Sequence, residues 1–126
     1  MKRMIWLLRI VGVIQIVLGV LYLFVPGFFL HLMGYSAPEA DIYYPLAMLA
    51  ARFMAFGIAL IYIANTPVQN KLWINILVLI QMIDLAAGIF YTAIGVVPLS
   101  LSGFPMFNAT WIIVLMLLWM PKEAKK

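Results

Sequence analysis

The sequence predicts an all-α integral membrane protein, a four-helix bundle in which the helices run up, down, up and down and both termini are cytoplasmic. Its 126 residues are 67% hydrophobic and only 10% charged, with a mean hydropathy of +1.14. A soluble globular domain is nearer to half apolar. A chain of this length has room for about four spanning helices of roughly 20 residues, and none for a second domain. We therefore expect a single transmembrane domain, residues 1–126.

The first span is expected at about residues 4–25. Lys2 and Arg3 before an apolar run resemble the start of a signal peptide, but the run is about as long as a spanning helix and no small-residue cleavage site follows it. Pro26 and Gly27 stop this helix. The apolar segment FFLHLMGY that follows is expected to form a short turn in the outer interface.

The second span is expected at about residues 43–64. Ser36 and Glu39 have the spacing of a capping box, which predicts a helix that begins by about Ala37 and enters the bilayer near Tyr43.

The third and fourth spans are expected at about residues 72–97 and 104–120. The polar segment NTPVQNK, residues 65–71, links the second span to the third. The segment PLSLSGFP, residues 98–105, is rich in helix-breaking residues and is expected to be the loop before the fourth span.

The positive residues outside the spans predict the orientation. With four crossings they all fall on one side, whereas the opposite loops hold Glu39 and Asp41 and no positive residue. Lys and Arg favour the cytoplasmic side, so both termini are expected there. This placement also explains the net charge of +4 by topology and contact with anionic lipid, so no nucleic-acid partner is predicted. The positive residues are Lys2, Arg3, Lys71, Lys122, Lys125 and Lys126.

Two opposite charges are expected at the same depth in the membrane. At 1.5 Å per residue, Arg52 in the second span and Asp84 in the third both lie roughly 12 Å from the outer face. Consecutive helices joined by a short loop are usually neighbours, so we predict an intramembrane Arg52–Asp84 ion pair. Either the pair is structural and fixes the helix register, or it lines a cavity that binds a polar head group or moves a proton.

Polar and small residues form a stripe on each of two spans, at spacings of three and four. Small residues allow close helix packing and glutamines bond across helices, so both stripes are expected to face the bundle interior. Gln15, Gln81, Tyr91 and Tyr22 are therefore candidate ligand-binding residues. The stripes are Gly12, Gln15, Gly19, Tyr22 and Pro26 in the first span, and Gln81, Asp84, Gly88, Tyr91 and Gly95 in the third.

The sequence contains no motif for catalysis, a metal or a cofactor. It has no cysteine and one histidine, which removes thiol chemistry and cysteine-bound metal centres from consideration. It also lacks a glycine-rich phosphate loop and a nucleophile–base pair. We predict no catalytic residue, no metal site and no cofactor.

The stretch RIVGVIQIVLGVLYLFVPGFFLHLMG, which ends at Gly34, and the later AARFMAFGIALI resemble the DoxX-like small four-helix bacterial membrane proteins. The shared features are the Leu-Gly of the first helix, the Pro-Gly that ends it, and Arg52 followed by a small residue and glycine. The resemblance implies a four-helix bundle in the inner membrane, sometimes encoded beside redox enzymes as an accessory subunit. Small multidrug transporters have a similar size, but they need an acidic residue where this sequence has Gln15.

The function expected first is that of a non-catalytic accessory or assembly subunit of a larger membrane complex, with a membrane-protein partner or a second copy of the chain. The alternative is a binder or carrier of a small amphipathic molecule, such as a quinone or lipid, with its polar end at the intramembrane polar residues. An enzyme is the least favoured class, because almost no mass lies outside the bilayer.

Overall fold

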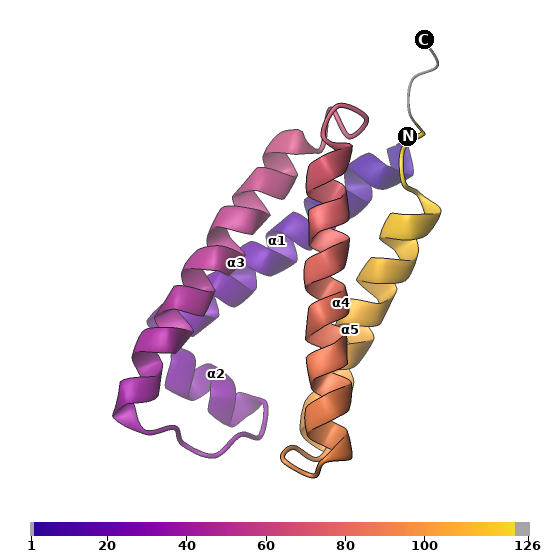
Figure 1. Ribbon diagram of the computed structural model, residues 1–126. Helices are drawn as coiled ribbons and strands as arrows, with labels where there is room; N and C mark the ends of the chain where they lie inside the picture. The colour runs from indigo at the N-terminus through magenta and orange to yellow at the C-terminus, as the bar shows by residue number, and fades with distance from the viewer. Residues whose placement is uncertain (1, 123–126) are drawn as a thin grey trace. The chain divides into compact units, whose positions relative to one another are not determined.

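The computed structural model describes residues 2–122, and all regular secondary structure in this part of the chain is helical (Figure 1). Its elements are, in chain order, α1 (Lys2–Phe24), α2 (Pro26–Leu32), the 3₁₀ helix η1 (Ala40–Ile42), α3 (Tyr43–Ile63), α4 (Lys71–Ala93) and α5 (Leu99–Leu118). Four segments are long and apolar enough to cross a membrane: α1, η1 with α3, α4, and α5. The all-α class and the four helices of spanning length are thus confirmed.

The chain divides into two compact units, which we describe one at a time. Residues 8–65 form the N-terminal unit, which holds most of α1 together with α2, η1 and α3. Residues 1–7 and 66–126 form the hairpin unit, which holds the first residues of α1 together with α4 and α5.

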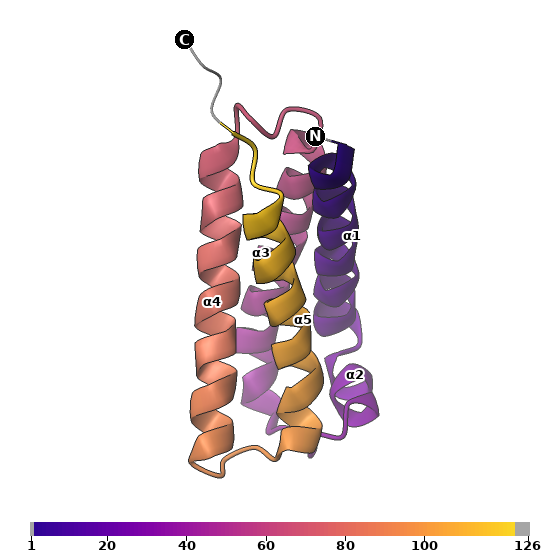
Figure 2. The ribbon, with the colours of Figure 1, turned by 90° about the vertical axis from the view of Figure 1, so that its right-hand side faces the viewer.

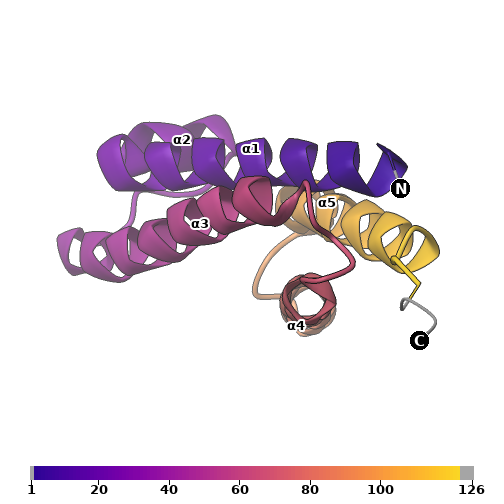
Figure 3. The same cartoon turned by 90° about the horizontal axis from the view of Figure 1, so that it is seen from above.

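Within the N-terminal unit, α1 and α3 lie side by side and approach each other closely (Figure 3). A Cβ atom built on Gly57 would lie 2.6 Å from the carbonyl oxygen of Gly12, and one built on Gly12 would lie 2.9 Å from the carbonyl oxygen of Gly57. One built on Gly19 would lie 3.0 Å from the carbonyl oxygen of Ala50. Backbones approach this closely only where side chains are minimal. The prediction that Gly12 and Gly19 allow close helix packing is confirmed.

The apolar segment after Pro26 is a helix, α2, where the sequence analysis expected a short turn. Pro26 stands in its first turn, where a missing N–H costs nothing, so the residue that ends α1 also begins α2. α2 ends at Leu32, with Met33 as its C-cap, and Gly34 then takes φ 95°. The N–H of Gly34 donates to the carbonyl oxygen of His31, and the N–H of Tyr35 donates to the carbonyl oxygen of Leu30. These are the two bonds of a Schellman motif.

The next helix begins later than predicted. Ser36 and Glu39 do not form the expected capping box: Glu39 has an extended backbone, with ψ 149°, and makes no side-chain cap hydrogen bond. Helical structure starts at Ala40 with η1 and continues as α3 from Tyr43. Pro38 accounts for the delay, because proline disfavours helical conformation in the residue before it, Ala37.

In the hairpin unit, α4 and α5 run antiparallel and side by side (Figure 2). α4 ends at Ala93, short of the predicted limit at residue 97, because Gly95 takes φ 82°. The N–H of Val96 donates to the carbonyl oxygen of Tyr91, and the N–H of Gly95 donates to the carbonyl oxygen of Thr92. These bonds again form a Schellman motif. The most deeply buried apolar side chains of the unit are Met4, Leu7, Ile74, Leu77, Val78, Ala109, Ile112 and Met116.

α5 begins at Leu99, five residues before the start predicted for the fourth span. Pro98 occupies the N-cap position with an extended backbone, and its carbonyl accepts hydrogen bonds from the N–H groups of Leu101 and Ser102. Pro105 stands inside the helix, where a proline is tolerated when neighbouring groups compensate for the lost hydrogen bond. The breaker-rich segment 98–105 is therefore mostly helix, and reading it as a loop was wrong.

Candidate functional site

Arg52 of α3 is exposed, and its guanidinium is held against its own helix. Nη1 donates a hydrogen bond of 3.0 Å to the carbonyl oxygen of Met48, one turn earlier. This bond uses one N–H of a guanidinium that carries five. The remaining donors allow Arg52 to receive an anionic partner at membrane depth.

Asp84 of α4 is also exposed. Arg52 belongs to the N-terminal unit and Asp84 to the hairpin unit. The Arg52–Asp84 ion pair therefore stays a prediction, which the variants proposed in the Discussion test.

The stripe on α4 does not lie wholly in the packed interior. Gln81 is buried, at 4% exposure, whereas Asp84 is exposed and Tyr91 is 48% exposed. At about 100° per residue, Gly88 lies only about 20° around the helix from Gln81, but Asp84 and Tyr91 lie about 60° and 80° away. The stripe is thus wide enough to have a packed edge, Gln81 and Gly88, and an exposed edge, Asp84 and Tyr91.

The packed edge of α4 meets α5 through a sulfur side chain and a pair of hydroxyls. A Cβ atom on Gly88 would lie 2.6 Å from Cγ of Met106, so the glycine makes room for that side chain. The hydroxyl of Thr92 lies 2.6 Å from that of Ser102 and 2.6 Å from the carbonyl oxygen of Gly88. Thr92 and Ser102 were not predicted, because Ser102 falls in the segment that was expected to be a loop.

Tyr22 lies in an aromatic cluster that joins the three helices of the N-terminal unit. Its ring stacks on Phe53 of α3, with centroids 5.9 Å apart and an interplanar angle of 14°. Phe29 of α2 meets it edge-on at 5.0 Å. Such aromatic pairs contribute about 0.5–1.5 kcal/mol each beyond their buried area. Tyr22 thus helps to hold α2 against α1 and α3, and Phe29 and Phe53 are cluster members that the helical spacing did not reveal.

Gln15 of α1 is buried, at 4% exposure, as the stripe on the first span predicts. A buried amide needs hydrogen-bond partners, because leaving it unpaired costs several kcal/mol in an apolar medium. Gln15 belongs to the N-terminal unit and Gln81 to the hairpin unit, so binding of one ligand by both residues remains a prediction.

Arg9, near the start of α1, is hydrogen-bonded to the polar linker. Its Nη2 donates a hydrogen bond of 2.7 Å to Oδ1 of Asn65, the first residue of the linker segment NTPVQNK. A long basic side chain near a helix end commonly reaches the interface in this way.

Among residues 2–122, no three histidine or acidic side chains come together in a way that would hold a metal ion.

No family model, no curated protein and no solved structure matches the chain.

Proposed function

We propose that the protein is a non-catalytic accessory or assembly subunit of a larger membrane complex, of the kind that DoxX-like proteins form, in the inner (plasma) membrane. The observation that carries this proposal is that the described residues lie mainly in helices long and apolar enough to cross a membrane. Most of them belong to the helices of spanning length, and the α3–α4 and α4–α5 connections are only residues 64–70 and 94–98. The longest described segment outside these helices is residues 25–39, which includes α2, so we expect the described part of the chain to act through its helix surfaces, which in lipid associate with other helices.

The proposed topology is up-down-up-down with both termini cytoplasmic. The grouping of the positive residues supports it. The hairpin unit adds a second argument, because the guanidinium carbon of Arg3 lies 5.9 Å from the centre of the Trp119 ring. Residues near the two ends of the chain therefore lie together, which favours an even number of crossings between them.

Extraction in mild detergent tests the subunit proposal. A copy tagged at the C-terminus is expected to migrate on a native gel in a particle larger than its own dimer, with one partner at constant stoichiometry. Deleting the chain is expected to lower the amount of the assembled partner, and re-expression to restore it. A monodisperse particle of this chain only, with an unchanged partner complex in the deletion strain, would contradict the proposal.

The alternative function is a carrier of a small amphipathic molecule, and one observation favours it: Asp84 and Tyr91 share an exposed edge of α4, two turns apart. Their polar groups would hold the head of a quinone or lipid. Mass spectrometry of molecules that stay bound through purification tests this, with Tyr91→Phe expected to lower retention about fivefold through one lost hydrogen bond. Tyr62→Phe is the matched control, because Tyr62 is 85% exposed and lies on another helix. Equal retention in both variants would argue against the carrier.

A further inference from the structure

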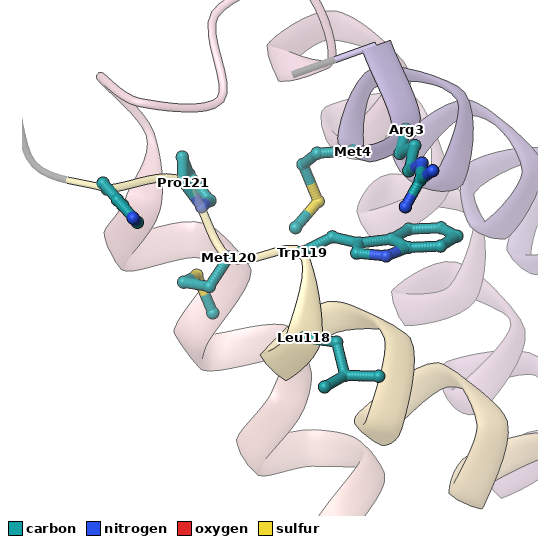
Figure 4. Close-up of a pocket in the computed structure, with 7 residues that line it drawn as sticks. Arg3, Met4, Leu118, Trp119, Met120 and Pro121 are labelled. Carbon is teal, nitrogen blue, oxygen red and sulfur yellow. The ribbon is translucent and has the colours of Figure 1, made fainter.

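The hairpin unit has a pocket where its two chain ends meet (Figure 4). It is a cavity of about 350 Å³ lined by residues from the start of α1 and from the end of α5 and the residues after it. Its volume is at the lower end of the roughly 300–1,000 Å³ that ligand sites occupy. The lining residues are Arg3, Met4, Leu118, Trp119, Met120, Pro121 and Lys122.

The chemistry of this lining is cationic at two points and apolar elsewhere. Arg3 and Lys122 supply two positive charges, and no carboxylate is among the lining residues within 2–122. The guanidinium carbon of Arg3 lies 5.9 Å from the centre of the Trp119 ring, within the range of a cation–π contact (Figure 4). A guanidinium presents its N–H donors in a planar fork that matches phosphate oxygens.

The pocket also stands at the boundary between apolar helix and polar chain end. Leu118 is the last residue of α5 and is 70% exposed, whereas Trp119 follows directly after the helix. Tryptophan prefers the membrane–water interface, where lipid head groups lie. A molecule held here would have its anionic group at Arg3 and Lys122 and its hydrocarbon beside Leu118.

We propose that this pocket binds the phosphate group of an anionic phospholipid of the cytoplasmic leaflet, with Arg3 and Lys122 as the cations, Trp119 as the platform and Leu118 against the acyl chain. The bound group is a phosphodiester anion; free inorganic phosphate has similar charge but lacks the hydrocarbon. Zwitterionic phosphatidylcholine carries the same phosphate with a compensating positive charge.

The test is native mass spectrometry of the purified full chain with phosphatidylglycerol, phosphatidylcholine or inorganic phosphate. Phosphatidylglycerol is expected to bind with defined stoichiometry and more tightly than phosphatidylcholine. Arg3→Gln and Lys122→Gln are each expected to weaken that binding about fivefold, the effect of one cation near an anionic surface. Arg3→Lys keeps the charge and is expected to recover most of the loss.

Lys71→Gln is the matched control, because it removes the same charge from the start of α4, outside the pocket. Circular dichroism and size-exclusion chromatography show that each variant stays folded. Equal weakening by Lys71→Gln would mean diffuse attraction and would overturn the proposal, as would equal binding of phosphatidylcholine. Displacement of the lipid by millimolar inorganic phosphate would show that the pocket takes free anions and would overturn its assignment to a lipid.

Discussion

Asp84 is the residue whose chemistry fits its surroundings least. It is exposed on the surface of a helix of spanning length, and translocon scales put a carboxylate at the middle of such a helix at roughly 2.5–3.5 kcal/mol. Arg52 has the same difficulty, and its bond to the Met48 carbonyl relieves only one of its donors. An opposite charge for each is the cheapest solution, which is the physical reason to expect that they pair.

Asp84→Leu is expected to lower the free energy of unfolding in detergent micelles by about 3–5 kcal/mol, because it leaves the Arg52 charge without its partner. The exchanged variant, Arg52→Asp with Asp84→Arg, is expected to regain part of that loss. Glu39→Leu is the control. It also removes an exposed carboxylate, but one that lies outside the helices of spanning length, and it is expected to change the free energy of unfolding by less than about 0.5 kcal/mol. Equal losses of stability in Asp84→Leu and in the exchanged variant would contradict the pair.

The spacing in the sequence predicted which residues form the helix stripes, but it did not predict which of these residues are buried. A spacing of three and four places Gln81, Asp84, Gly88 and Tyr91 on one side of α4, but that side is about 80° wide. Which part of such an arc is packed depends on the neighbouring helix, and α5 meets this arc at Gly88, where Met106 lies. The pattern therefore predicted the buried Gln81 and did not distinguish it from the exposed Tyr91.

At the scale of the elements, the interface of α1 with α3 depends on Gly57. Gly57→Ala is expected to lower the free energy of unfolding by about 1–3 kcal/mol, because the new Cβ would lie 2.6 Å from the carbonyl oxygen of Gly12 and the backbones would have to move apart. Gly103→Ala is the matched control within α5, since nothing lies within 4 Å of its Cβ position. It is expected to be neutral or stabilising by up to about 1 kcal/mol. An unfolding free energy for Gly57→Ala equal to that of Gly103→Ala would contradict close packing at this point.

Gly95 tests backbone conformation and not space, because its Cβ position is as open as that of Gly103. Its φ of 82° is a left-handed conformation that costs an alanine about 1 kcal/mol. Gly95→Ala is thus expected to destabilise the hairpin unit by about that amount. Gly103→Ala makes the same chemical change in open space, with the opposite expected sign. Chemical denaturation of the two variants side by side measures the difference, and identical midpoints would refute the role assigned to Gly95.

Helix boundaries were the least predictable part of the elements. Hydropathy located all four helices of spanning length, but the sequence analysis took Pro98 and Pro105 as limits of a loop and Pro26 as the start of a turn. A proline in the first turn of a helix loses no hydrogen bond, so the same residue ends one helix and begins the next. Composition does not reveal which of these two roles a proline has.

For the whole molecule, the topology can be measured directly because the chain has no cysteine. Single cysteines at Gln69 and Lys122 are expected to resist a membrane-impermeant maleimide in intact cells and to react after lysis, since both positions are predicted to be cytoplasmic. Cysteines at Glu39 and Ser100 are expected to react in intact cells. All four residues are exposed, so accessibility within the protein does not confound the comparison. Labelling of Gln69→Cys in intact cells would overturn the proposed orientation.

The hairpin unit contains both the beginning of the chain and its last helix, with the N-terminal unit inserted between them. A ribosome makes residues 2–7 before the N-terminal unit and residues 99–122 after it. Because domains fold as units, and the earlier one first during synthesis, the N-terminal unit has all of its sequence before the hairpin unit does. Residues 2–7 are therefore synthesised before all the later helices, and their unit is complete only when α5 has been made. A nascent chain arrested before α5 would therefore lack the residues beside which Arg3 and Met4 lie in the complete unit.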